Sequence, residues 1–164
     1  MFESIHVLRT NIGAREIRIL RIAAGALAIF VGWVHVLHPD YGYFQLLLYV
    51  EFGTVYDPRP PLFVLSGLAI FVGVVLLIYD RSKRHLYLLG IVLMVTYIVG
   101  YVSWHTVLDH GAFWPYIEPH HHHDVGVIGS MIDHLRADTI ALVSKLAELL
   151  LLVLLVLLYR FDTD

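Results

Sequence analysis

Cysteine is absent from the 164 residues of this chain. Its absence excludes disulfide bonds, thiolate metal sites and thiol redox chemistry. Charged residues are also scarce, at 15% of the chain, against roughly a quarter in soluble domains. Hydrophobic residues make up 59% of the chain and the mean hydropathy is +0.74. The composition therefore predicts an integral membrane protein whose main partner is the lipid bilayer.

Several well-known functional motifs are missing too. The chain has no Gly-rich phosphate loop, no Gly-x-Ser-x-Gly nucleophile elbow and no His-Glu-x-x-His zinc motif. It also has no basic patch interleaved with aromatic residues, so nucleic acid is not an expected partner. These absences leave open whether the protein is an enzyme.

The hydrophobic residues fall in four blocks that have the length of membrane spans. About 20 helical residues, each rising about 1.5 Å, cross a hydrocarbon core of roughly 30 Å. We expect spans at about 17–37, 62–79, 86–104 and 139–159. Only residues 80–85 separate the second and third spans, which favours an antiparallel hairpin. The sequence predicts an all-α, four-helix transmembrane bundle that forms one domain over residues 1–164.

Residues 41–52 are too apolar for a water-exposed loop and too short to cross the bilayer. We expect an outer interfacial or re-entrant helix here, ended by Gly53.

Lysine and arginine are distributed unevenly between the two sides of this arrangement. Eight lie on the side that holds both termini and the 80–85 turn: Arg9, Arg15, Arg18, Arg21, Arg81, Lys83, Arg84 and Arg160. The opposite side has only Arg59 and Arg136. Because basic residues are enriched in cytoplasmic segments, we predict a multi-pass protein of the cell membrane with cytoplasmic N- and C-termini.

Histidines are concentrated in the predicted outer loop 105–138, which contains seven of the eleven in the chain. Imidazole is the commonest protein metal ligand, and carboxylates beside it suit zinc, copper or iron. The candidate ligands in this loop are His105, Asp109, His110, His120, His121, His122, His123, Asp124 and His134. The run 120–123 has no defined ligand geometry, so a solvated or pH-responsive loop is the alternative interpretation.

Two histidine-containing pairs lie at the outer ends of predicted helices. His35 and His38 are three residues apart on the first span, and His105 and Asp109 are four apart at the end of the third. If these two spans are neighbours, the four side chains converge on one ion. A divalent zinc, copper or iron centre is one form of this hypothesis. The alternative is that they are interfacial histidines with a packing role.

A b-type haem is a second form of the cofactor hypothesis, with His35 and His105 as axial ligands across the bundle. A haem needs small residues beside each histidine, and Gly25, Gly32 and Gly100 could provide them. The same glycines are equally typical of helix–helix packing in membranes.

Lys145 and Glu148 are three residues apart in the fourth span and share a face. An unpaired carboxylate in mid-span costs several kcal/mol, so we expect a Lys145–Glu148 pair turned into the bundle. Such a pair has a structural role or acts in proton relay or substrate contact.

Three features of residues 15–105 occur together. The first span is led by arginines in Arg18-Ile-Leu-Arg21-Ile-Ala-Ala-Gly25, an apolar half-helix follows outside, and the second span is led by prolines and contains Gly67 and Gly73. In this layout the chain resembles the DoxX-like family of small four-span membrane proteins. The resemblance implies a redox subunit or an accessory protein of a quinone-linked enzyme, and assigns no site residue.

The leading hypothesis is a membrane protein that binds a metal ion or haem at its outer face, in redox or ion handling. One alternative is a non-catalytic accessory subunit of a membrane complex, or a homo-oligomer. The other is a small proton-coupled transporter that uses Lys145 and Glu148.

Overall fold

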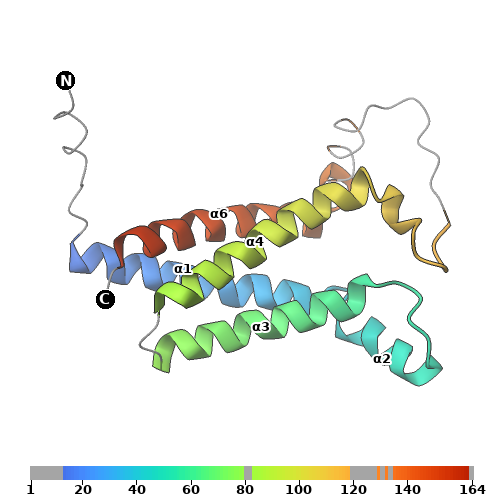
Figure 1. Cartoon of the computed structure of the whole chain (residues 1–164), viewed down its shortest axis with the longest axis horizontal. Coiled ribbons are helices and arrows are strands. Elements are labelled where there is room, and N and C mark those ends of the chain that lie inside the picture. The colour runs from blue at the N-terminus through green and yellow to red at the C-terminus, as the bar shows by residue number, and fades with distance from the viewer. Residues whose placement is uncertain (1–12, 80–82, 119–128, 130–131, 133–134, 163–164) are drawn as a thin grey trace.

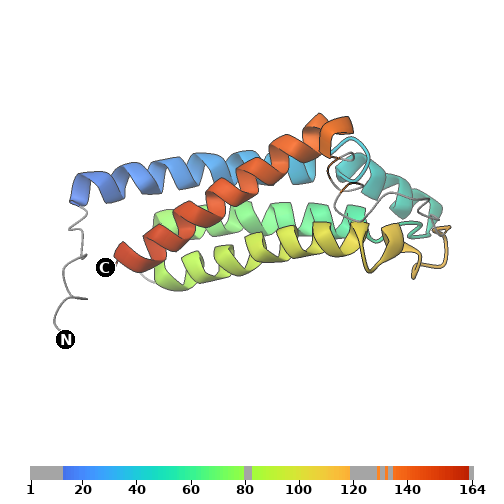
Figure 2. The same cartoon turned by 90° about the horizontal axis from the view of Figure 1, so that it is seen from above.

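The computed structural model describes residues 13–79, 83–118, 129, 132 and 135–162. In this part of the chain four long helices run side by side (Figures 1 and 2): α1 (Ala14–Val36), α3 (Arg59–Tyr79), α4 (Lys83–His105) and α6 (Thr139–Phe161). Each is long and apolar enough to cross a membrane. The predicted all-α bundle of four spans is confirmed, and the chain is a multi-pass membrane protein.

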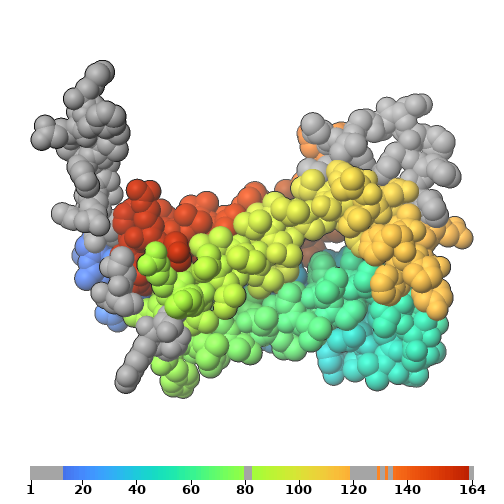
Figure 3. Space-filling view, in the orientation of Figure 1, coloured from blue at the N-terminus to red at the C-terminus, as the bar shows by residue number. Residues whose placement is uncertain are grey.

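The bundle has two distinct ends (Figure 1). The terminal end holds Ala14, Tyr79, Lys83 and Phe161, and the α2 end holds Val36, Arg59, His105 and Thr139. The short helix α2 (Tyr43–Phe52) and the single-turn 3-10 helix η2 (Asp109–Gly111) lie at the α2 end. Figure 3 shows α3 and α4 along one face of the molecule, with α2 and the segment after α4 gathered at one end.

The helices pack in a ring rather than in an all-against-all cluster. The main packed pairs are α1 with α3, α4 with α6 and α1 with α6, and α3 with α4 packs less extensively. Among the described residues, α1 and α4 do not form a closely packed pair. The first and third spans are therefore diagonal partners rather than neighbours.

Capping explains where two of the spans begin. The helix α3 begins at Arg59, three residues before the expected start, because prolines are tolerated in the first turn of a helix. The Asp57 carboxylate accepts the backbone N–H of Arg59 at 2.8 Å. Asp138 caps α6 in the same way, accepting the N–H of Ala141 at 3.0 Å.

The helix expected at 41–52 is observed as α2, which packs against α3. Gly53 ends it in the left-handed conformation with φ 65°, a position that favours glycine. Phe44, Val50 and Phe52 on α2 are each more than half exposed. An exposed apolar surface on a short helix is typical of a helix that lies at a membrane interface.

Close approach of two glycines brings α1 and α3 together. A Cβ on Gly67 would lie 2.7 Å from Val36 and 3.0 Å from the carbonyl of Gly32. A Cβ on Gly32 would lie 2.8 Å from the Phe71 ring. Gly32 is therefore a helix-packing residue. Of the two roles expected for it, room for a haem and helix–helix packing, this contact supports packing.

Arg59 joins three segments at the α2 end. Its guanidinium lies 4.0 Å from the ring centroid of Tyr41 and 4.4 Å from that of Trp104. The same side chain donates to both carboxylate oxygens of Asp57. Cation–π contacts on two rings are worth about 0.5–2 kcal/mol each, so Arg59 ties the start of α3 to the end of α4.

Candidate functional site

The imidazole of His35 is buried at 2% exposure near the end of α1 and points into the bundle. Its Nδ1 lies 2.9 Å from the carbonyl oxygen of Val31. A carbonyl oxygen only accepts hydrogen bonds, so Nδ1 must carry the proton. Nε2 is therefore the atom that exposes a lone pair, or takes up a second proton.

Nε2 of His35 faces Glu148 on α6, at 3.7 Å from Oε1. The two residues come from different helices, which pack against each other, and Glu148 is 0% exposed. A distance of 3.7 Å is longer than a hydrogen bond, yet close enough for direct electrostatic interaction. The sequence predicts the two residues in separate candidate sites, because spacing within one helix gives no information on contacts between helices.

The Glu148 carboxylate has two further partners on its own helix. Lys145 Nζ donates to Oε1 at 2.9 Å and to Oε2 at 2.7 Å. The Ser144 hydroxyl donates to Oε1 at 2.9 Å. The predicted Lys145–Glu148 pair turned into the bundle is confirmed, and the structure adds Ser144 and His35 to it.

Aromatic rings hold the His35 imidazole in place. The ring stacks on Tyr97 of α4, with centroids 4.1 Å apart and planes 12° apart, and makes a tilted contact with Phe63 of α3, with centroids 4.8 Å apart. The buried hydroxyl of Tyr97 makes no hydrogen bond of normal geometry within the described residues, although Ser66 of α3 lies near it. Lys145 lies over the Tyr97 and Tyr101 rings, at 5.9 and 5.2 Å. All four spans therefore contribute to the site.

With a neutral imidazole, the charges of Lys145 and Glu148 cancel. One added proton on Nε2 of His35 gives Glu148 two cationic partners, one on each helix. An uncompensated charge is costly in the membrane interior, and a proton added at Nε2 would face the Glu148 carboxylate 3.7 Å away. The arrangement therefore places a proton-accepting nitrogen of α1 opposite a buried carboxylate of α6.

His38 lies just beyond α1 and is also buried, at 7% exposure. Its Nδ1 accepts the backbone N–H of Asp40 at 3.2 Å, and its ring stacks on Tyr41 at 4.8 Å. Burial lowers the pKa of His38 from its ordinary value, against the opposing effect of the Asp40 charge. Both His35 and His38 contact the Phe63 ring, at centroid distances of 4.8 and 5.6 Å, so one aromatic side chain of α3 links the two histidines.

The predicted ligands at the end of α4 and in η2 form a separate group. His105 Nδ1 lies 2.9 Å from the Tyr101 carbonyl, and its ring contacts those of Tyr101 and His110. Asp109 and His110 have positive φ, at 42° and 54°, an uncommon conformation outside glycine. Within the described part of the chain, no three His, Asp or Glu side chains are grouped closely enough to hold one metal ion.

The run His120, His121, His122 and His123, together with Asp124 and His134, lies outside the described residues. The metal and haem hypotheses therefore stay predictions from the sequence.

A second polar cluster lies at the terminal end, and the sequence does not predict it. The Arg21 guanidinium of α1 donates to both oxygens of Asp162, through Nε at 2.5 Å and through Nη2. The Tyr87 hydroxyl of α4 donates to Asp162 Oδ2 at 2.6 Å. In the sequence Arg21 is one of the basic residues that predict the orientation, and Asp162, one residue beyond α6, belongs to no motif.

Comparisons with protein-family models, with curated proteins and with solved structures found no match to this chain.

Proposed function

We propose that this protein is a small proton-coupled membrane carrier in which His35 and Glu148 form the proton-binding unit. The observation that carries the proposal is the 3.7 Å approach of Nε2 to Oε1 between two buried residues of different spans. Ionisable residues inside a membrane are costly to keep and mark ion or substrate pathways. A purely structural Lys145–Glu148 pair would not need a third titratable group directed at the same carboxylate.

The proposed step is a reversible protonation. A proton from water binds Nε2 of His35 and gives an imidazolium that faces the Glu148 carboxylate. The imidazolium and Lys145 then compete for Glu148, because a carboxylate has a limited number of acceptor positions. Closer contact with His35 draws α6 toward α1 and weakens the bond to Lys145. Release of the proton restores the Lys145–Glu148 pair.

Proton flux into liposomes tests this function. Full-length protein is reconstituted with a pH-sensitive dye inside, and a pH gradient is applied with a potassium ionophore present to dissipate the membrane potential. We expect flux above that of protein-free liposomes, and its loss in His35→Gln and Glu148→Gln. The matched controls are His85→Gln and Glu51→Gln, which change exposed residues of the same two types and should keep the flux. Equal flux in Glu148→Gln and Glu51→Gln would exclude the proposal.

We also propose the orientation in which both termini are cytoplasmic. It rests on the excess of arginine and lysine at the terminal end over the α2 end. In this orientation His35 and Lys145 lie toward the outer side, so protons enter from outside.

Metal or haem binding is a separate proposal that rests on the histidines of residues 105–138. Elemental analysis and a visible spectrum of protein purified without an immobilised-metal step test it. A stoichiometric metal or a Soret band would support it, and their absence would count against it.

A further inference from the structure

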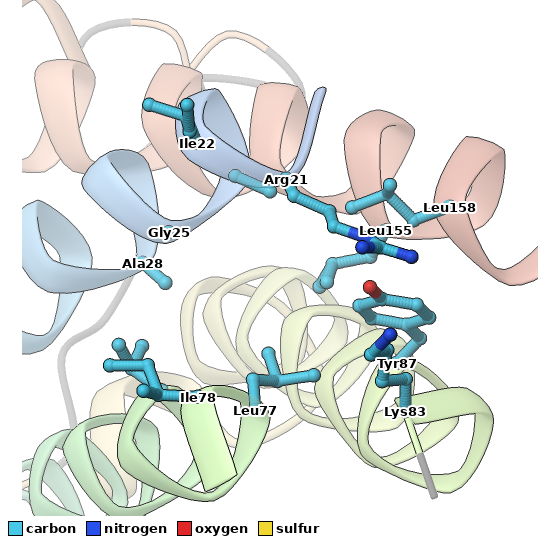
Figure 4. Close-up of a pocket in the computed structure, with 12 residues that line it drawn as sticks. Arg21, Ile22, Gly25, Ala28, Leu77, Ile78, Lys83, Tyr87, Leu155 and Leu158 are labelled. Atoms are coloured by element: carbon cyan, nitrogen blue, oxygen red, sulfur yellow. The ribbon is translucent and has the colours of Figure 1, made fainter. Parts of the chain in front are cut away.

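A cavity of about 240 Å³ lies between the four spans in the half of the bundle near the terminal end (Figure 4). Its walls are apolar and include Ala28 of α1, Leu77 of α3 and Leu155 of α6. Ile22 of α1 and Ile78 of α3 also line it, and they are 64% and 73% exposed. The cavity therefore reaches the lipid-facing surface between α1 and α3.

Divergence of α1 and α3 creates this space. At the other end of the same pair, a Cβ on Gly32 or Gly67 would meet atoms at less than 3 Å. At Gly25, which lines the cavity, a Cβ would meet nothing within 4 Å. The helices are in tight contact toward the α2 end and are separated by an open space near Gly25.

One end of the cavity is polar and positively charged. Figure 4 shows the Arg21 guanidinium, the Tyr87 hydroxyl and the Lys83 ammonium group on the same side, away from Ala28 and Ile78. Arg21 and Lys83 supply two positive charges and Asp162 supplies one negative charge, which leaves one net positive charge. The pair with Asp162 uses two of the five N–H donors of Arg21, so the guanidinium retains donors for a second anion.

The volume suits part of a hydrocarbon chain. An apolar cavity of roughly 150 Å³ is known to take up a benzene molecule, and this one is larger. A water-soluble anion would make no favourable contact with the apolar walls, and a neutral hydrocarbon would make no ionic contact with Arg21 and Lys83. The combination fits an amphiphile with an anionic head and an apolar tail.

We propose that this cavity is a binding site for an anionic membrane phospholipid. The phosphate of the headgroup lies against Lys83 and the free N–H groups of Arg21, and part of one acyl chain enters between α1 and α3. The proposal does not depend on proton transport, because its residues are distinct from His35, Glu148 and Lys145.

Native mass spectrometry of the full-length protein tests the site. The protein is released from detergent micelles containing equal amounts of phosphatidylglycerol and phosphatidylcholine, and the retained lipids are counted. We expect phosphatidylglycerol to be retained in preference. Lys83→Gln should reduce that preference about fivefold, the effect of roughly 1 kcal/mol for one lysine near an anionic lipid. Arg84→Gln is the matched control, because Arg84 lies over the Tyr159 ring and does not line the cavity.

A second pair of variants tests the tail. Gly25→Leu fills the cavity without a backbone clash and should remove the retained lipid. Gly100→Leu is its control, since a Cβ there also meets nothing within 4 Å and Gly100 does not line the cavity. Equal retention of the two lipids by the wild type, or unchanged retention in Gly25→Leu, would overturn the proposal. Displacement of the lipid by excess inorganic phosphate would also overturn it, and would assign the cations to a free anion.

Discussion

At the scale of single residues, the two polar clusters of this bundle solve the same physical problem in different ways. Asp162 is a buried carboxylate with strong donors on two other helices, Arg21 and Tyr87. Glu148 has donors on its own helix and faces His35, at a distance that is not yet a hydrogen bond. The first arrangement is saturated and suits a structural role. In the arrangement around Glu148, Nε2 of His35 can take up one more proton.

Removal of the Asp162 charge should destabilise the protein. Burial alone would raise the pKa of Asp162, but hydrogen bonds from Arg21 and Tyr87 outweigh it, so its pKa lies below the ordinary value of 3.8. A lowered folded-state pKa stabilises the fold above pH 3.8, and this contribution is lost as the pH falls through the folded-state pKa. We expect Asp162→Asn to lose about 2 kcal/mol at neutral pH, seen as a lower Tm.

The pH profile of that variant provides the internal control. The Tm of the wild type should fall in strong acid, in part because Asp162 becomes protonated. Asp162→Asn should lack that part of the fall. Tyr87→Phe, which removes one donor and keeps the charge pair, should cost less, about 1 kcal/mol. A Tm for Asp162→Asn equal to that of the wild type would contradict the structural role.

At the scale of helices, the pair α1 and α3 determines the shape of the bundle. Contact at Gly32 and Gly67 fixes one end of the pair, and the gap near Gly25 opens the other. Membrane helices gain little from the hydrophobic effect against each other, so close backbone approach at small residues provides much of their association. The crossing also sets the position of His35, whose Cβ lies 3.2 Å from the place a Gly67 Cβ would occupy.

Gly67→Val should therefore separate α1 from α3 and disturb His35. Overpacking of this kind typically costs about 1–3 kcal/mol. Gly73→Val is the matched control on the same helix, because a Cβ at Gly73 meets nothing within 4 Å. We expect a lower Tm and a reduced proton flux for Gly67→Val only. Similar behaviour of the two variants would contradict the proposed crossing.

At the scale of the whole molecule, the absence of cysteine allows a direct test of orientation. The chain has no native thiol, so a single introduced cysteine is the only labelling site. His85 follows the start of α4 at the terminal end and Glu51 lies on α2, and both are exposed. In intact cells, a membrane-impermeant maleimide should label Glu51→Cys and should label His85→Cys only after lysis. The reverse pattern would place the termini outside.

The sequence predicts the features that depend on residues close together in the chain, and does not predict contacts between residues of different helices. The four spans, α2 with Gly53 at its end, and the Lys145–Glu148 pair follow from hydropathy and spacing within one segment. The His35–Glu148 and Arg21–Asp162 contacts do not, because they depend on which helices are neighbours. The hypothesis of one metal site shared by His35, His38, His105 and Asp109 requires the first and third spans to be neighbours. The order of the helices in the ring makes these two spans diagonal instead.

The central claim is that Nε2 of His35 takes up a proton opposite Glu148. Nitrogen NMR of His35, measured across a pH titration of isotope-labelled protein in bilayers, tests it most directly. The structure predicts that Nδ1 stays protonated at every pH, because it donates to the Val31 carbonyl, while Nε2 changes state. The Lys145 resonance should shift over the same pH range, and Glu148→Gln should alter the titration curve of His35. An unprotonated Nδ1, or a His35 curve that is identical in Glu148→Gln, would contradict the account.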